Sequence, residues 1–273
     1  MEILFFIKAA FLFLLGTIFG SFANVLVDRG ERKESLLGSS HCDFCKKDLR
    51  WFENIPVLGY FFVKGKCSKC KKKLSFQYPM VEFCIGLLFL AVGFKTGLIL
   101  TLSSSWSIIF ETSYFLAIIF ILSAIFIWDL KYMIILDRLV LTGAVLTVVY
   151  TVVQYLNSSC SIFSISCFVT ENLLGALLVG GFFQALFVIS KGKWIGGGDV
   201  KIGFWLGFLI GWKHVYPFLL ITYVVGAIIS LILVKKSKKG WKSQIPFGPF
   251  LVISSFIFLF FGEKLLYLYE RLF

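Results

Sequence analysis

Residues 107–129 read SIIFETSYFLAIIFILSAIFIWD, an apolar run that ends on an aspartate. A helix that crosses a bilayer needs roughly 20 predominantly apolar residues, and this run is long enough. Similar runs recur along the chain, in which 59% of the 273 residues are hydrophobic and 15% are charged. Soluble domains have about 45–50% apolar residues. The sequence therefore predicts an all-α polytopic membrane protein.

About eight transmembrane helices are predicted from these runs. Their approximate bounds are 3–27, 79–101, 107–128, 139–155, 172–190, 199–214, 216–234 and 247–267. The first run lacks the basic start and the small-residue cleavage pattern of a signal peptide, so we expect it to stay in place as a helix.

The net charge of +12 is concentrated in alternate connections between these runs. Segment 28–78 carries twelve Lys and Arg residues, and further basic residues lie in 129–138, 191–201 and 235–243. Basic connections of membrane proteins face the cytoplasm, which predicts eight spans with both termini outside. Lysines at that surface would contact anionic lipid headgroups. The charge is thus explained by the lipid bilayer, and we expect no nucleic-acid partner.

Four cysteines in the large basic connection form two C-x2-C pairs separated by 21 residues, at Cys42, Cys45, Cys67 and Cys70. This spacing is typical of a tetrahedral structural Zn²⁺ site, in a small zinc-ribbon-like module with strands between the pairs. Redox dithiols or free cysteines are the alternatives. We expect His41 to be a bystander, not a ligand. Cys84 is expected to pack inside the second span, and Cys160 and Cys167 could form a disulfide if the outside is oxidising.

Two aspartates lie at predicted cytoplasmic ends of spans, Asp129 after the third and Asp199 before the sixth. Charges at such positions are costly enough to need a reason. Asp199 could simply cap its helix, and Asp129 and Asp137 could be solvated turn residues. The alternative is a carboxylate pair that shares one proton, with one member acting on water as general base and the other as general acid. That chemistry is aspartic proteolysis.

Three glycines, Gly196, Gly197 and Gly198, precede Asp199 directly. A turn without side chains leaves room for an extended substrate backbone beside the carboxylate. Glycine also tolerates the positive φ that such a turn would need. We therefore predict that these glycines contribute to substrate binding.

Six features in order resemble the type IV prepilin peptidase family, whose members are GxGD-type membrane aspartic peptidases. These features are GSFANVLVDR at 20–29, the two C-x2-C pairs around IPVLGY, YPMVE at 78–82, D-x7-D at 129–137, GGGD at 196–199 and PFGPFL at 246–251. The likeness covers nearly the whole chain. One departure is Leu136, which stands where the family usually has proline; proline would favour the start of the next helix.

The resemblance implies a multi-pass enzyme of the bacterial inner membrane with its active site facing the cytoplasm. Its catalytic pair would be Asp129 and Asp199. The substrates would be prepilins or pseudopilins of pili or secretion systems, cut after a Gly that ends a short basic leader. Many members then methylate the new N-terminus with S-adenosylmethionine. We expect Glu82 as a candidate cofactor-binding residue, or as a helix-terminal acid favoured by the helix dipole, and Asp137 as a candidate receptor of the basic leader.

These expectations divide the chain into a first transmembrane helix (1–28), a cysteine module (29–78) and a membrane-embedded aspartic peptidase domain (79–273). Two alternatives remain open at this point. One is a peptidase without the methyltransferase activity, and the other is a non-catalytic membrane scaffold or transporter with a zinc module. The aspartates lie at one predicted face and not across the bilayer, which argues against a transporter.

Overall fold

The structure is a computed structural model that describes residues 2–42, 44–101, 105–158, 167–236 and 245–272. It divides into two compact units, Met1–Ala124 (unit 1) and Ile125–Phe273 (unit 2). The described residues form helices and, in place of strands, two isolated β-bridges. The predicted all-α class is therefore confirmed.

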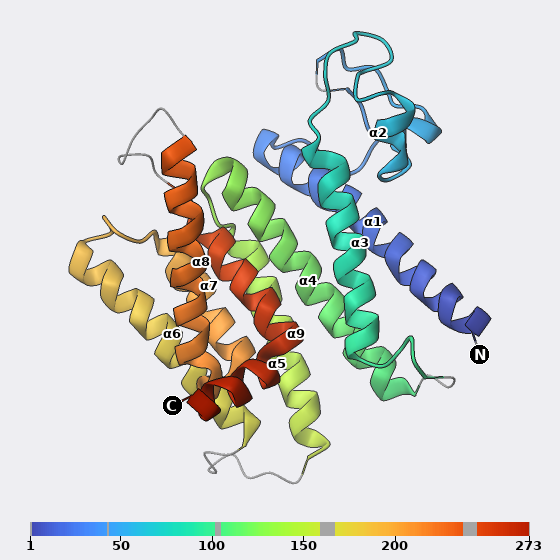
Figure 1. The fold of residues 1–273 in the computed structure, drawn as a ribbon. Helices are drawn as coiled ribbons and strands as arrows, with labels where there is room; N and C mark the ends of the chain where they lie inside the picture. The colour runs from blue at the N-terminus through green and yellow to red at the C-terminus, as the bar shows by residue number, and fades with distance from the viewer. Residues whose placement is uncertain (1, 43, 102–104, 159–166, 237–244, 273) are drawn as a thin grey trace. The chain divides into compact units, whose positions relative to one another are not determined.

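All eight predicted apolar runs form helices (Figure 1). They are α1 (Glu2–Arg32), α3 (Gln77–Lys95), α4 (Trp106–Tyr132), α5 (Asp137–Leu156), α6 (Phe168–Ser190), α7 (Gly197–Ile210), α8 (Val215–Lys236) and α9 (Gly248–Leu272). Prolines stand in the first turn of three of them, at Pro79, Pro217 and Pro249. There the missing N–H costs no hydrogen bond, because the first amides of a helix have no partner within it.

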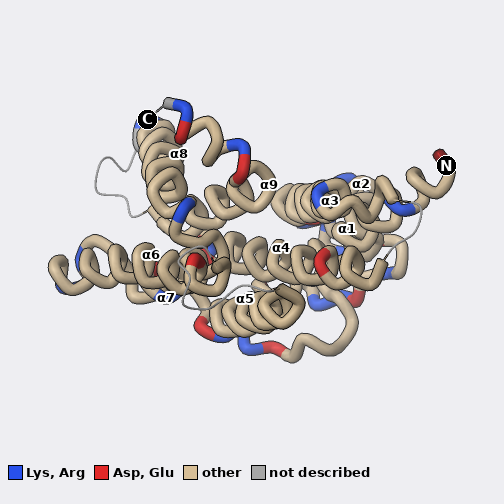
Figure 2. Tube along the Cα trace, turned by 90° about the horizontal axis from the view of Figure 1, so that it is seen from below, with Lys and Arg blue, Asp and Glu red and all other residues tan. Residues whose placement is uncertain are grey.

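Seven helices in the described part of the chain are long and apolar enough to cross a membrane, so the protein is a multi-pass membrane protein. The exception is α7, which has 14 residues where a longer span over 199–214 is predicted. At 1.5 Å per residue it is about 21 Å long, against roughly 30 Å for the hydrocarbon core. It ends early because Gly211, with φ 74°, leaves the helical conformation. Charged residues lie mainly near helix ends and in connections (Figure 2).

Unit 1 consists of α1, α3, residues 106–124 of α4 and the cysteine module between α1 and α3 (Figure 1). Arg29, near the end of α1, is buried and donates hydrogen bonds to the carbonyls of Ser35, Leu36 and Ser39 at 2.8–3.2 Å. These bonds fasten the start of the module to the helix. Tyr78 of α3 donates to Asp28 of α1 at 2.8 Å and ties together the two helices that carry the module.

The segment between the two cysteine pairs differs from the prediction, because it forms short helices where strands are expected. A 3₁₀-helix, η1, covers Trp51–Asn54, and α2 covers Leu58–Phe62. The turn between them packs tightly, since a Cβ on Gly59 would lie 2.3 Å from the carbonyl oxygen of Glu53. The apolar run around IPVLGY therefore folds back on η1 and does not extend along a strand.

Unit 2 is built around α7, which carries Asp199. Helices α6 and α7 lie side by side (Figure 1) and touch through backbone at Gly175 and Gly207, where a Cβ on either would lie 2.3 Å from the other's carbonyl oxygen. On α7, the Trp205 indole N–H donates to Thr147 of α5 at 3.0 Å. Buried indole groups of this kind need a partner, so the bond fixes the rotation of α7 against α5.

Two cysteine predictions outside the module have different outcomes. Cys84 is exposed on the surface of α3, so it does not take part in the packing that was predicted for it. Helix α3 is apolar on all sides, so its sequence gives no sign of which face turns inward. Cys167 is disulfide-bonded, and Cys160 lies outside the described residues.

Candidate active site and metal centre

Asp129 and Asp199 lie at two helix ends of unit 2. Asp129 is in the last turn of α4, and its side chain is buried, with 5% of the residue exposed. Its Oδ2 atom has no hydrogen-bond partner among the residues the structure describes. Asp199 is half-buried in the first turn of α7. The two carboxylates, 70 residues apart in sequence, thus lie at neighbouring helix ends, because Ile135 lies against both Gly198, next to Asp199, and Gly248, next to Asp129.

Asp199 takes part in capping its helix, as one of the two interpretations predicted, although it stands at the third helical position and not at the N-cap itself. The residue before the helix is Gly196, and its N–H donates to Asp199 Oδ2 at 3.2 Å. Asp199 therefore reaches back to the start of its own helix, where the helix dipole favours an anion. This bond fixes one carboxylate oxygen and turns the side chain toward the helix N-terminus.

The glycines before Asp199 have ordinary negative φ angles, so the expectation of positive φ at this turn was wrong. The left-handed positions lie earlier, at Lys191 and Gly192, where the chain leaves α6. What distinguishes the three glycines is space. A Cβ on Gly197 would have no atom nearer than 4.0 Å, whereas one on Gly198 would lie 3.0 Å from Ile135. Gly198 is thus packed, and Gly197 leaves room beside Asp199.

A third helix end, the start of α9, meets Asp129. A Cβ on Gly248 would lie 2.5 Å from Asp129 Oδ2 and 3.3 Å from Ile135. Ile135 thus stands between the starts of α7 and α9. Sequence reasoning placed Gly248 in a family motif but gave it no role, because a glycine shows its packing only once its neighbours are known.

Asp137, the predicted receptor of the leader, already has a partner. Lys201 of α7 donates to both of its carboxylate oxygens, at 2.7 Å each. The side chains are exposed, at 56% for Lys201 and 68% for Asp137. Exposed ion pairs contribute about 0.2–1 kcal/mol to stability. The sequence gave no reason to pair these two residues, because they are 64 positions apart.

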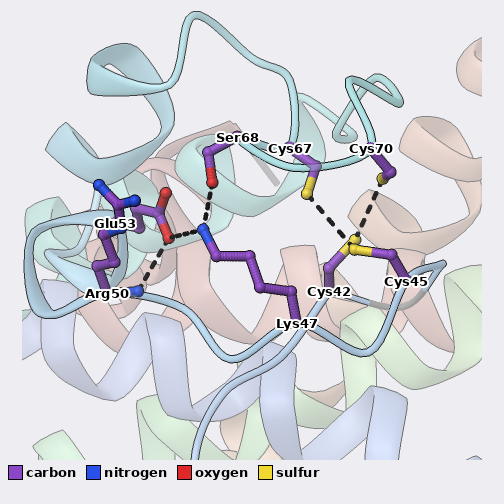
Figure 3. Close-up of polar contacts among 8 residues, drawn as sticks. All are labelled: Cys42, Cys45, Lys47, Arg50, Glu53, Cys67, Ser68 and Cys70. Atoms are coloured by element: carbon purple, nitrogen blue, oxygen red, sulfur yellow. Dashed lines mark hydrogen bonds and ion pairs between the residues drawn. The ribbon is translucent and has the colours of Figure 1, made fainter.

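The four cysteine thiols of the module converge, and their sulfur atoms all lie within 4.8 Å of one another (Figure 3). Each C-x2-C pair folds in the same way. The N–H of Cys42 donates to Lys47 and the N–H of Lys46 donates to Cys42; in the second pair Cys67, Lys72 and Lys71 repeat these bonds. Lys46 and Lys71 take the same left-handed conformation. Two matched knuckles thus face each other.

The geometry of the cluster fits a tetrahedral metal ion. The sulfur of Cys42 lies 3.9 Å from that of Cys70, and Cys45 lies 3.9 Å from Cys67. Zn–S bonds of about 2.3 Å in a tetrahedron place two sulfurs roughly 3.8 Å apart. Backbone N–H groups of Cys70 and Lys69 lower the pKa of the Cys67 thiol to about 6. The backbone N–H of Lys72 would lower the pKa of the Cys70 thiol, but desolvation and the neighbouring thiols outweigh it and raise the pKa to about 11. A thiolate is the form that binds metal, so these four residues could hold an ion.

A buried polar network, which sequence reasoning missed, adjoins the cysteines. Lys47 donates to Ser68 at 2.5 Å and lies 3.5 Å from Glu53, which also accepts from the N–H of Arg50 at 2.9 Å (Figure 3). The Glu53 side chain is only 3% exposed. Burial would raise the pKa of Glu53, but hydrogen bonds from Ser68 and Arg50 and the Lys47 charge outweigh it and lower the pKa. The network links the two knuckles to η1.

A cavity of about 200 Å³ lies in unit 1 between the module, the end of α1 and the start of α3. Glu82 and Asn24 line it, and both are buried. Glu82 accepts a hydrogen bond from the N–H of Val57 at 2.6 Å, and this bond joins α3 to the module. Val57 has φ 63°, which is a strained conformation for a β-branched residue. Asn24 Oδ1 has no partner within the described residues.

Comparison with known proteins finds two domains in order. The Bacterial Peptidase A24 N-terminal domain matches residues 14–96, and the Type IV leader peptidase family matches residues 115–231. No solved structure matches the chain.

Several relatives carry the name prepilin leader peptidase/N-methyltransferase. The protein of Bacillus subtilis is 27% identical, over 96% of this chain and 97% of its own length. That of Legionella pneumophila is 32% identical, over 86% and 78%, and that of Pseudomonas aeruginosa is 28% identical, over 92% and 90%. The chain therefore belongs to the type IV leader peptidase family and is an enzyme of the prepilin peptidase kind.

Proposed function

We propose that Asp129 and Asp199 are the catalytic pair of an aspartic endopeptidase that removes the leader of prepilin-like proteins after a Gly. The observation that supports this proposal is that both aspartates lie at helix ends next to Ile135, and that Oδ2 of the buried Asp129 has no hydrogen-bond partner among the residues that the structure describes. Two close carboxylates of this kind share a proton. The open side of Gly197 leaves room for an extended peptide.

The reaction then follows from one shared proton. The ionised aspartate takes a proton from water, whose oxygen attacks the carbonyl carbon of the leader Gly, while the protonated aspartate gives its proton to the carbonyl oxygen. The tetrahedral intermediate collapses as its C–N bond breaks. The departing amine receives the proton that was taken from water, and the other aspartate regains its proton from a hydroxyl of the intermediate as the C=O bond re-forms. Both carboxyls return to their starting state. Burial strengthens each of these interactions.

The substrate would be met at the cytoplasmic side of the bacterial inner membrane. The alternation of basic connections along the chain supports this orientation. A short basic leader would lie in the cytoplasm, with the apolar helix of the prepilin or pseudopilin in the bilayer. The role of Asp137 in receiving that leader stays a prediction.

The cavity of unit 1 is the candidate site for S-adenosylmethionine, which supplies the methyl group when bound. Asn24 Oδ1, which is buried and has no partner in the described part of the chain, and the carboxylate of Glu82 fit a ligand that donates hydrogen bonds or carries positive charge. These two acceptors would orient the ligand, and the wall formed by the module would exclude water. We propose that Glu82 is the carboxylate of a methyltransferase site that modifies the new N-terminal amine.

The cysteine cluster would hold a structural Zn²⁺. Four thiolates complete a tetrahedral shell and leave no open position for catalysis. The ion would supply folding free energy to a module that has little core of its own.

Mass spectrometry of the processed substrate tests the cleavage site and the methylation together. The purified enzyme in mild detergent is incubated with a prepilin, with and without S-adenosylmethionine. The expected product begins directly after the leader Gly and gains one CH₂ only when the cofactor is present. A product that never gains CH₂ supports the alternative, a peptidase without methyltransferase activity. Cleavage elsewhere contradicts the proposed specificity.

A further inference from the structure

The ion pair between Asp137 and Lys201 joins the start of α5 to the N-terminal part of α7, and each member lies near one candidate catalytic residue in the sequence. Asp137 is the first residue of α5, eight positions after Asp129. Lys201 lies on α7, two positions after Asp199. The two Nζ–Oδ distances of 2.7 Å make the contact bidentate. Each member of the pair thus lies on the same short stretch of chain as one of the two aspartates.

The turn that links Asp129 to Asp137 is also packed on its inner side. Met133 turns the chain with φ 56°, and its N–H donates to the carbonyl of Asp129. Ile135 then fills the space next to Gly198 and Gly248. The ion pair lies on the outer side of the same turn. The start of α7 is therefore held against this turn by an apolar contact within and an ionic contact outside.

The exposure of the pair shows that its main effect is not on stability. Both side chains are more than half exposed, and such pairs add little to the free energy of folding. Geometry is a more sensitive property here, because a shift of about 1 Å at a catalytic group lowers rates by about 100-fold. A contact that adds little stability can therefore still matter for the reaction.

We propose that Asp137 and Lys201 are positioning residues that act as one unit and set the placement of Asp199 against Asp129, an inference that rests on the proposed roles of those two aspartates. On this inference the pair acts on the placement of the catalytic carboxyls, which is an alternative to the predicted role of Asp137 as receptor of the leader. It holds the first turn of α7 on the turn after α4, so that the two carboxyls keep the separation at which they share a proton.

A double-mutant cycle with two prepilin substrates tests this inference. Asp137→Asn, Lys201→Met and the double variant are compared for kcat and KM, using one leader with its basic residues and one with those residues replaced by Gln. If the two residues act as one unit, the losses of activity in the two single variants do not add in the double variant. We expect each single change to lower kcat about 10-fold with both leaders, with no further loss in the double variant. Lys201→Arg, which keeps a bidentate donor, should restore most of the activity.

A matched control is the ion pair between Lys213 and Glu171, at the other end of α7, where the Nζ–Oε1 distance is 2.5 Å. Lys213→Met and Glu171→Gln should leave kcat unchanged. Glu171 is only 19% exposed, so the loss of this pair should lower the unfolding temperature at least as much as Lys201→Met does. Unchanged kcat in Lys201→Met overturns the proposal, as do losses that multiply in the double variant. A rise in KM confined to Asp137→Asn and the basic leader would instead show that Asp137 receives the leader. Activity retained in Asp199→Asn would show that the proposed function itself has failed.

Discussion

Replacement of Gly248 by alanine should disable the peptidase without unfolding it. The new Cβ would lie 2.5 Å from Asp129 Oδ2, whereas an ordinary contact begins at 3.4 Å. The carboxylate must therefore move by about 0.9 Å, or α9 must move by the same amount. A misplacement of about 1 Å at a catalytic group costs about 100-fold in rate. That loss equals about 2.7 kcal/mol of transition-state stabilisation.

The assay is the initial rate of prepilin cleavage in detergent at saturating substrate, with thermal unfolding and gel filtration measured on the same samples. Gly181→Ala is the matched control, because a Cβ there meets nothing within 4 Å and the residue lies in the middle of α6. Gly198→Ala should fall between the two, since its Cβ would lie 3.0 Å from Ile135 and needs a smaller adjustment. Gly248→Ala that folds normally and retains wild-type kcat would refute the reasoning.

Three further predictions concern unit 1. Glu82→Gln should abolish methylation but leave leader cleavage intact, measured by mass spectrometry of the product; loss of both activities, or of neither, contradicts a separate site. Cys67→Ser, or a strong chelator, should release the metal and unfold the module, seen as metal content by elemental analysis and as new proteolytic cuts within 29–78; a protected module without metal would show that the ion is dispensable. The folded-state pKa of Glu53 is lowered, so its stabilisation is complete above its ordinary pKa near 4.5 and is lost as pH falls through the folded value. The difference in unfolding temperature between wild type and Glu53→Gln should therefore shrink on acidification, and a constant difference would refute this.

The helices and the cysteine cluster were predictable because they depend on local patterns. The length of an apolar run defines a membrane helix. Each C-x2-C pair forms its turn through local backbone hydrogen bonds, which are the same at Cys42 and Cys67. The end of α7 was missed because it depends on one positive φ at Gly211. A window of mean hydropathy does not respond to a single backbone angle.

The surroundings of the two aspartates were less predictable. Chemistry and motif order indicated Asp129 and Asp199, but the contacts of Ile135 and Gly248 depend on three helix ends that are far apart in sequence. Neither residue carries a charge or a reactive group, so nothing in the sequence marks them. The pairing of Lys201 with Asp137 was missed for the same reason, because long-range partners are not encoded in local spacing.

The requirement for both carboxylates is the central claim, and it is tested by prepilin cleavage with Asp129→Asn and Asp199→Asn. Asparagine keeps the shape of each side chain and removes its ability to hold the shared proton. We expect both variants to fold, to bind metal as the wild type does and to show no cleavage above background. If either variant still cleaves the leader at a substantial rate, that residue is not part of a catalytic pair and the account is wrong.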